Sequence, residues 1–343
     1  MYAKHRQRTQ HLRVAHFQRK RSKTHFSVEG YFARVRECME SNINVTLHTA
    51  PFYSRGFFRR LGNVAWSLIH QADINHITGD ITYLGIFLRK SRTVLTILDC
   101  QVLDRLQGWR RWIVVYLWFK IPVLRSQIVT VISAETKTKL LEFARVDESK
   151  IRIVPVSVSA LYTPYPKPFE TNLPRILQVG TKANKNIPRL LEALAGIPAQ
   201  LTIIGPIDRA LQANIDRLQI DVKNFVGLSD AELAEQYRAA DLLAFVSTCE
   251  GFGMPIVEAQ FVERPVLTSN CSSMPEVAGE GACLVDPFNV QSIRSGLRRI
   301  IDDGEYRERL IENGRINRDR FSKEQIAKQF AEIYLSLNGT YQG

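Results

Sequence analysis

The chain has 343 residues, of which 45% are hydrophobic, and its 46 Lys and Arg against 34 Asp and Glu give a net charge of +12. This composition excludes an intrinsically disordered chain, and the length predicts two domains at roughly 150 residues per domain. The longest apolar run, residues 113–119, is far shorter than the ~20 residues that span a bilayer, so we expect no transmembrane helix.

Short apolar runs alternate with longer helical patterns in the first half, which predicts βαβ units and a parallel sheet. Helices are expected around 30–40 and 136–143. Strands are predicted at 12–17, 44–49, 74–78, 93–98, 128–133 and 152–158. Residues 162–174 then contain four prolines and little periodicity, so they are predicted to be an interdomain linker.

The second half repeats the alternation. Strands are predicted at 175–180, 200–205, 222–227, 242–247, 265–269 and 283–286. Helices are predicted at 187–194, 230–240, 255–262 and 290–301. The sequence therefore predicts an α/β protein with two doubly wound, Rossmann-like parallel-sheet domains, 1–165 and 166–343. Ligands of such sheets bind at the carboxyl ends of the strands.

The positive charge is concentrated in one half. Residues 1–170 carry 27 Lys and Arg against 12 Asp and Glu, whereas residues 171–343 carry 19 against 22. The basic half could face an anionic membrane, a phosphorylated acceptor or nucleic acid, or its charge could be ordinary solvated surface. No RNA- or DNA-reading motif is visible, so nucleic acid is not an expected partner.

Residues 108–127 are both aromatic and basic. Five apolar side chains can share much of one helical face: Trp109, Trp112, Ile113, Tyr116 and Phe119. Such a helix is typical of a membrane interface, although a helix packed against the sheet would look similar. Together with the basic residues between 4 and 23, the first interpretation predicts peripheral attachment to an anionic inner leaflet.

Two glutamates, Glu250 and Glu258, bracket a glycine-rich turn within residues 247–260. Gly251 and Gly253 allow close approach of the backbone or a positive φ, and the amides of the following helix suit a diphosphate. Glu258, expected in the first helical turn, is either a partner of the helix dipole or a ribose ligand. Glu250, at the end of the strand, either lines the binding crevice or is a solvated loop residue.

Three segments resemble, in order and spacing, motifs of the GT-B-fold retaining glycosyltransferases of family 4 (glycosyl transferases group 1). Residues 177–194 resemble the strand, loop and helix that open the nucleotide domain. Residues 228–259 contain the E-x7-E motif, and residues 272–289 resemble the PEV-x-G … DP stretch that follows it. The resemblance implies the GT-B fold, in which two Rossmann-like domains face a cleft and the last helix, at about 323–338, crosses back to the first domain.

The resemblance also implies residue roles. Glu258 would bind the donor ribose, Glu250 the donor sugar hydroxyls, and Lys185 would neutralise the leaving phosphates. The diphosphate would lie against the two glycine-containing turns, which comprise Gly180, Thr181, Gly251, Phe252, Gly253 and Met254. Family members often have arginine where this chain has Thr181, so Lys182 is a substitute for that cation. Ser273 and Glu276 have capping-box spacing and either cap a helix or pack beside the nucleotide.

The first half resembles the acceptor domain of the family more loosely, at residues 75–85, 93–103 and 129–141. Many members have histidine before an aspartate that reaches the donor sugar, but here Leu98 precedes Asp99. Asp99 is expected either to retain a catalytic role or only to end a strand. His76 and Asp80 are expected to line the acceptor cleft or to be structural, and Gly30 replaces part of a glycine-rich loop.

The resemblance thus implies transfer of a hexosyl unit, with retention, from a UDP- or GDP-sugar to a glycan or lipid-linked acceptor in cell-surface polysaccharide or glycolipid synthesis. No metal and no cofactor beyond the donor is expected. Five cysteines without a CxxC motif, and no signal peptide, favour the cytoplasm. The alternatives are a catalytically weakened homologue that acts as a binding protein, or an epimerase or phosphorylase on the same fold.

Overall fold

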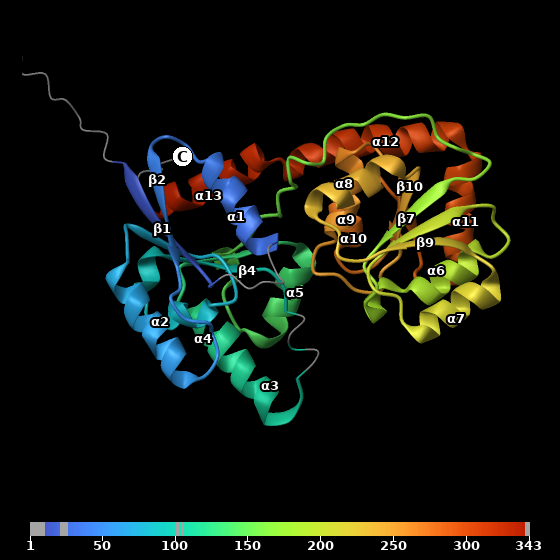
Figure 1. Cartoon of the computed structure of the whole chain (residues 1–343). Helices are drawn as coiled ribbons and strands as arrows, with labels where there is room; N and C mark the ends of the chain where they lie inside the picture. Colours follow the sequence, from blue (N-terminus) through green and yellow to red (C-terminus); the bar gives the residue numbers. More distant parts are fainter. Residues whose placement is uncertain (1–10, 21–26, 101–102, 104–105, 340–343) are drawn as a thin grey trace, which may run out of the picture. The chain divides into compact units, whose positions relative to one another are not determined.

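The structure is a computed structural model that describes residues 11–20, 27–100, 103 and 106–339. It divides into two compact units, which are coloured blue to green, with a red helix, and green to red in Figure 1. The first unit is Met1–Ser157 with Lys323–Gly343, and the second is Val158–Ser322.

The boundary between the units lies before the predicted 165/166 position. Residues after Ser157 already pack within the second unit. The amide of Val158 donates to the carbonyl of Phe321 over 3.3 Å, and the Tyr162 ring lies edge-on to Tyr237 with centroids 5.3 Å apart. The last helix, α13 (Lys323–Leu337), belongs to the first unit.

Six parallel strands form the sheet of the first unit in the order β2-β1-β3-β4-β5-β6. They are β1 (Leu12–Gln18), β2 (Ile43–Thr49), β3 (Ile74–Ile77), β4 (Thr93–Ile97), β5 (Ile128–Val131) and β6 (Ile151–Ile153). Each predicted strand is present, but β6 ends well before residue 158. The amide of Val154 still donates to the carbonyl of Val131 over 2.8 Å, just after the strand ends.

Helices cover both faces of this sheet. They are α1 (Ser27–Glu37), α2 (Phe57–Ile69), α3 (Gly108–Val114), α4 (Ile121–Leu124), α5 (Ala134–Phe143), the 3₁₀ turns η1 (Thr82–Ile86), η2 (Lys90–Arg92) and η5 (Glu148–Lys150), and the π-helix η4 (Val115–Lys120). Val14 of β1 packs in the cluster formed with α1 and α13, whereas Ala15 and Phe17 pack in the cluster formed with α2, η1, α4 and α5. The alternating side chains of one strand thus serve two cores.

The aromatic segment 108–127 does not present one continuous face. Trp109 and Trp112 in α3 are 70% and 65% exposed, but Phe119 in η4 is buried. A π-helical turn holds more residues than an α-helical turn, so η4 rotates the later side chains away from the line set by α3. Within the described ranges, no helix is long and apolar enough to cross a bilayer.

The second unit has a parallel sheet in the order β12-β11-β10-β7-β8-β9. Its strands are β7 (Arg175–Val179), β8 (Gln200–Ile204), β9 (Asp221–Phe225), β10 (Leu242–Phe245), β11 (Val266–Ser269) and β12 (Cys283–Val285). This is the doubly wound dinucleotide-binding order, in which the winding direction reverses between the first and fourth strands. The reversal here lies between β7 and β10.

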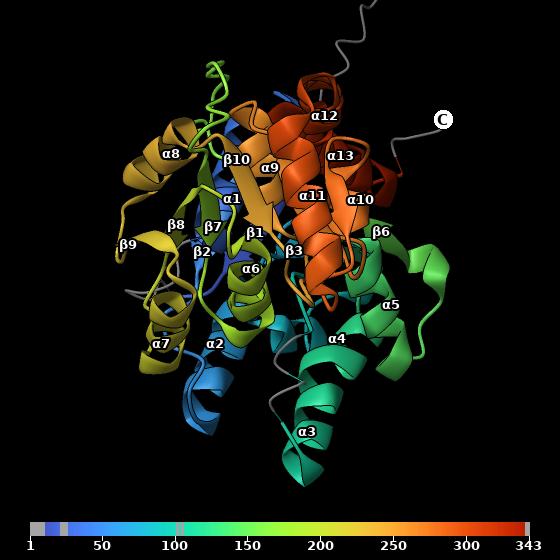
Figure 2. The same cartoon turned by 90° about the vertical axis from the view of Figure 1, so that its right-hand side faces the viewer.

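The helices of the second unit lie on the two sides of that sheet. They are α6 (Ile187–Leu194), α7 (Arg209–Leu218), α8 (Asp230–Ala239), α9 (Met254–Phe261), α10 (Met274–Ala278), α11 (Val290–Asp302), α12 (Gly304–Arg318) and the 3₁₀ turns η6 (Ala183–Lys185) and η7 (Asp319–Phe321). Helices α6, α7 and α11 share one hydrophobic cluster with the strands. Figures 1 and 2 show α8, α9 and α10 on the opposite side of the sheet.

Candidate functional site

Two loops meet at the point where the second sheet reverses its winding. One follows β7 and contains Gly180 and η6; the other follows β10 and leads into α9. Gly180 has φ +86°, and a Cβ built on it would lie 2.9 Å from Cε of Lys185. A glycine is therefore needed at this position for the backbone conformation and for the passage of the lysine side chain.

Lys185 and Glu250 form the charged centre of this crevice. Lys185 Nζ lies 2.6 Å from Glu250 Oε1, and the two side chains are 14% and 11% exposed. Asn184 Nδ2 donates to the same carboxylate oxygen over 3.1 Å, and the lysine ammonium also lies 4.3 Å from the centroid of the Phe245 ring. The structure thus brings together the two residues that the sequence predicts as a phosphate cation and a sugar ligand.

Hydroxyl and amide side chains hold the Glu250 loop in place. The backbone N–H of Glu250 donates to Ser272 Oγ over 3.2 Å, and Ser272 Oγ donates back to the Glu250 carbonyl over 2.9 Å. Ser273 Oγ donates to the carbonyl of Phe252 over 2.8 Å. The predicted capping box of Ser273 and Glu276 is therefore wrong, because the Ser273 side chain makes no cap bond to α10 and bonds this loop instead.

The turn into α9 begins with a glycine in the left-handed region. Gly253 precedes the helix with φ +103°, and Met254 and Pro255 open it. The ring of Phe252 is buried and packs edge-on to the ring of Phe321. The side chain of Phe252 is therefore used in packing, and only its backbone is available at the turn. The amides of Gly253 and Met254 therefore lie at the positive end of a helix dipole.

Glu258 is the fifth residue of α9, so it does not lie in the first helical turn as predicted. The hydroxyl of Tyr237, in α8, donates to Glu258 Oε2 over 2.6 Å. Burial, followed by the nearby Glu258 charge, raises the pKa of Tyr237 well above its usual value, so the hydroxyl stays a donor. Tyr237 is a site residue that sequence reasoning missed; only its location in the segment that resembles the family, 228–259, pointed to it.

Thr181 and Lys182 continue the loop after Gly180. Thr181 is half-buried, and a Cβ on Gly205 would come within 2.9 Å of its Oγ1, so the side chain packs against the loop after β8. Lys182 is exposed at the start of η6. Lys182, the candidate for the cation that the family's arginine supplies, thus lies on the same loop as Lys185, and its role stays a prediction.

Two residues of the first unit that were predicted to line the cleft, His76 and Gly30, lie inside secondary-structure elements. His76 is fully buried, with Nδ1 2.6 Å from the Tyr334 hydroxyl and Nε2 2.7 Å from Thr96 Oγ1. The expectation that it lines a cleft is wrong, because its position in β3 directs it under α13 into the core. Gly30 is half-buried at the end of the first turn of α1.

Asp99 and Asp80 follow β4 and β3 at the carboxyl edge of the first sheet, and both are exposed. Asp99 lies in the first unit, whereas Lys185 and Glu250 lie in the second. The catalytic role of Asp99 therefore stays a prediction. Leu98, before it, is half-buried.

A charged cluster at the same edge joins Asp80 to two residues, Arg19 and Glu29, that were not predicted as site residues. Arg19, after β1, pairs through Nε with Glu29 Oε1 over 2.8 Å and through Nη1 with Asp80. The first sheet reverses its winding between β1 and β3, which is where these residues lie. The signal in the sequence was a charged residue shortly after each of two neighbouring strands: Arg19 directly follows β1, and Asp80 lies three residues after the end of β3.

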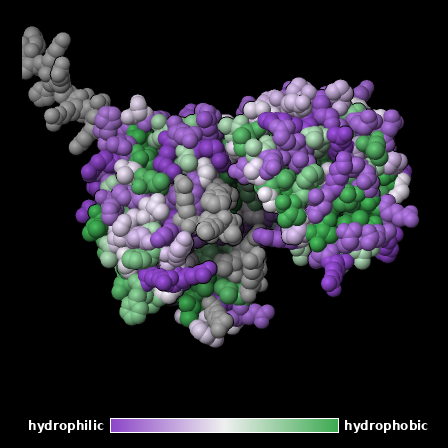
Figure 3. All heavy atoms as spheres, in the orientation of Figure 1, coloured by the Kyte–Doolittle hydropathy of each residue, from purple (hydrophilic) through white to green (hydrophobic). Residues whose placement is uncertain are grey.

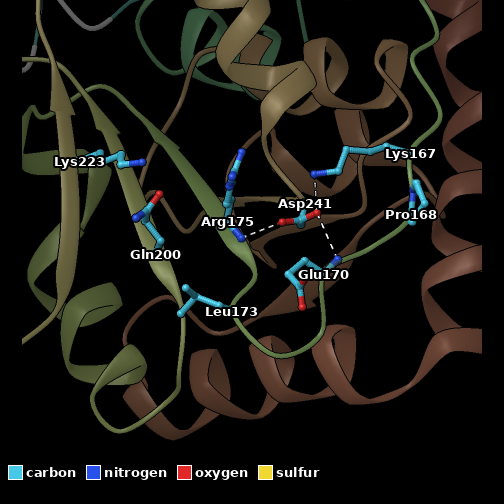
Figure 4. Close-up of a pocket in the computed structure, with 8 residues that line it drawn as sticks. All are labelled: Lys167, Pro168, Glu170, Leu173, Arg175, Gln200, Lys223 and Asp241. Atoms are coloured by element: carbon cyan, nitrogen blue, oxygen red, sulfur yellow. Dashed lines mark hydrogen bonds and ion pairs between the residues drawn. The ribbon is translucent and has the colours of Figure 1, made fainter.

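A hollow of about 460 Å³ lies at the opposite edge of the second sheet (Figure 4). Its lining includes Arg175 and Gln200, the first residues of β7 and β8, and Asp241, directly before β10. Asp241 accepts from the amides of Glu170 and Arg175 and pairs with Lys167 over 2.6 Å. These bonds attach the linker to the sheet, so the hollow is separate from the Lys185–Glu250 crevice. Among the described residues, no group of three or more His, Cys, Asp or Glu could hold a metal ion.

The second unit is similar to a family of known proteins. The family Glycosyl transferases group 1 matches residues 166–317. The chain is 29% identical over 221 residues to an MMP alpha-(1->4)-mannosyltransferase of Mycolicibacterium hassiacum, which is 61% of this chain and 53% of that protein. It is 30% identical over 173 residues to the O-antigen chain mannosyltransferase B of Escherichia coli, which is 47% of this chain and 45% of that protein. The chain thus spans about half the length of these curated relatives.

Solved structures share the architecture. The Anabaena protein HepE, in complex with UDP and glucose, has a TM-score of 0.74 at 18% identity over 95% of this chain and 100% of that one. WaaG, a glycosyltransferase involved in lipopolysaccharide biosynthesis, has a TM-score of 0.67 at 17% identity over 94% and 99%. At these identities the likeness is one of fold. The chain therefore has the GT-B fold, and its residues 166–317 are similar to the glycosyl transferases group 1 family.

Proposed function

We propose that the protein is a cytoplasmic, retaining glycosyltransferase that moves a hexosyl unit from a nucleotide-diphosphate sugar to a glycan or lipid-linked acceptor in cell-surface polysaccharide or glycolipid synthesis. The observation that carries the proposal is the buried Lys185–Glu250 pair at the reversal point of the second sheet. The two curated relatives are mannosyltransferases, which makes mannose the first sugar to test. HepE in complex with UDP-glucose supports a nucleotide-sugar donor.

In this proposal the donor diphosphate enters between the Gly180 loop and the start of α9. The Lys185 ammonium then exchanges its contact with Glu250 for the phosphate oxygens, which carry more negative charge. Glu250, kept in place by Asn184 and Ser272, becomes available to the sugar hydroxyls. Glu258 takes the ribose while Tyr237 holds one of its carboxylate oxygens.

The chemical step breaks the bond between C1 of the sugar and the phosphate oxygen and forms a bond from C1 to the acceptor oxygen on the same face. The acceptor proton passes to the departing phosphate oxygen. Negative charge grows on the diphosphate as the bond breaks, and Lys185 with the α9 amides stabilises that charge. The cation that the leaving group needs is thus supplied by the protein, which is the basis for proposing a metal-independent reaction.

Neither alternative is favoured. The two curated relatives are named as transferases, not as epimerases or phosphorylases. A binding protein that had lost catalysis would not need a lysine and a glutamate 65 residues apart to meet at 2.6 Å beside the α9 turn.

Lys185→Ala should lower kcat/KM for hexosyl transfer by about 10²- to 10³-fold, the usual loss on removing one preorganised stabiliser of developing charge. The matched control is Lys223→Ala, which removes an exposed lysine of the hollow in Figure 4. Transfer is measured with GDP-mannose and UDP-glucose, after a thermal-shift screen has identified the nucleotide that stabilises the protein. Equal turnover in the two folded variants would contradict the proposed role of Lys185.

A further inference from the structure

The solvent-facing side of α2 is apolar. Phe57, Phe58, Leu61, Leu68 and Ile69 are 72%, 84%, 52%, 42% and 80% exposed. At 3.6 residues per turn they fall within roughly one third of the helix circumference. The residues that α2 buries include polar ones, Asn63 and Ser67. This is the reverse of a surface helix in a globular protein, whose apolar stripe faces the core.

The same end of the first unit carries further exposed aromatic side chains. Trp109 and Trp112 of α3 are 70% and 65% exposed. Both α2 and α3 point towards one end of the first unit in Figures 1 and 2, and apolar residues gather over that end in Figure 3. The helices are linked through η4, because the Arg60 guanidinium lies 4.4 Å from the centroid of the Trp118 ring. Apolar patches of this kind usually mark an interaction surface.

The segments that form this surface are rich in basic residues, and the nearby Asp73, which follows α2, interacts with Arg13 and Arg92. Three segments of the sequence contain α2, η1, η2, α3, η4 and α4. There are three Lys or Arg in residues 41–72, three in residues 81–98 and five in residues 105–134. None of these three segments contains an Asp or Glu. Arg55 and Arg59 are exposed beside the aromatic residues of α2. A second copy of this chain is a poor occupant, because self-complementary pairing would set these arginines against one another.

An anionic bilayer satisfies both features. Its headgroup region accepts aromatic and aliphatic side chains, and its surface charge attracts the surrounding arginines and lysines. We propose that α2 and α3 of the first unit form a docking surface for the interface of an anionic lipid bilayer, with Phe58 and Ile69 as its most exposed apolar anchors on α2. The inference goes beyond glycosyl transfer and does not depend on it.

The test is co-sedimentation of the full chain with vesicles of phosphatidylcholine alone and of phosphatidylcholine mixed with phosphatidylglycerol. We expect binding to the mixed vesicles only, weakened by salt, and at least tenfold weaker binding by the variant Phe58→Ser with Ile69→Ser. The matched control, Phe288→Ser with Ile316→Ser, replaces residues that are 60% and 66% exposed in the second unit and should bind as the unchanged protein does. The basic N-terminal residues are the same in all three proteins.

Several results would overturn the inference. They are no vesicle binding by the unchanged protein, equal binding to neutral vesicles, equal loss in both variants, or full binding by the α2 variant. A dimer in sedimentation analysis that the α2 variant abolishes would assign the surface to a second copy instead. Folding is checked by thermal unfolding, which these exposed substitutions should leave unchanged. A nucleotide-sugar thermal shift that persists in the α2 variant separates failure of docking from failure of the proposed function.

Discussion

At the scale of single residues, the candidate site of the second unit contains one tightly paired lysine and glutamate. Lys185 and Glu250 neutralise each other over 2.6 Å in a largely buried position. An unpaired charge at such a position would be costly, because it has lost much of its hydration. In the proposed function, the donor diphosphate therefore replaces Glu250 as the partner of the Lys185 ammonium. Tyr237 is arranged differently, since its hydroxyl holds Glu258 without carrying a charge.

Tyr237→Phe should raise KM for the donor by roughly tenfold and change kcat little, because a hydrogen bond to a charged group contributes about 1.5–3 kcal/mol. Tyr237 acts through Glu258 and so is a positioning residue. The matched control is Tyr31→Phe, in the first unit, which removes a buried hydroxyl that donates to the Pro155 carbonyl over 3.1 Å. Steady-state kinetics that give the same donor KM for both variants would count against a positioning role.

At the scale of elements, the loops at the carboxyl ends of β7 and β10 set the geometry of the site. Their positions follow from strand order, because the reversal point of a doubly wound sheet leaves a crevice between two diverging loops. Glycines with positive φ form the turns on both sides, Gly180 after β7 and Gly253 before α9. The sequence predicts these strands and the helices that follow them, since each has a strong local pattern.

Gly180→Ala should cost about 1–2 kcal/mol of unfolding free energy through its positive φ and should also abolish most transfer, because the new methyl group meets the Lys185 side chain. Gly227→Ala is the matched control. Gly227 has φ +73°, and a Cβ there meets nothing within 4 Å, so it adds the same backbone strain without the contact. Calorimetry and transfer rates test the pair; similar activity in both would remove the argument that Gly180 makes room for the lysine.

At the scale of the whole molecule, the two ends of the sequence complete one unit. The C-terminal helix α13 packs on the sheet of the first unit, and its Tyr334 hydroxyl lies 2.8 Å from His16 Nε2 and 2.6 Å from His76 Nδ1. Burial lowers the pKa of His76 to about 3, and burial, with the neighbouring His76 and Arg36, lowers the pKa of His16 well below its usual value. Both rings are therefore neutral in the folded unit.

Folding of the first unit should therefore weaken on mild acidification. In the unfolded chain these histidines titrate near 6.5, so below that pH the unfolded state binds more protons than the folded state. Their stabilising contribution is complete above about pH 6.5 and declines by about 1.4 kcal/mol per pH unit for each histidine as the pH falls towards the folded values. The four tryptophans, Trp66, Trp109, Trp112 and Trp118, lie in the first unit. Denaturant unfolding followed by tryptophan fluorescence between about pH 7.5 and about pH 5 tests this, and a flat profile would contradict it.

The sequence by itself determined the types of the elements and the predicted position of the candidate site. Alternating apolar runs define the strands because period-2 burial is a local property, and the glutamates of the E-x7-E segment lie near β10 and α9 through chain connectivity alone. Contacts between distant segments were decided only by the tertiary structure. Packing of α13 buried His76, strand adjacency joined Arg19 to Asp80, and α8 brought Tyr237 to Glu258. The exposed apolar face of α2 is also a feature that only the tertiary structure decided. An apolar stripe in the sequence predicts a helix, but the neighbouring elements determine which side of that helix is covered.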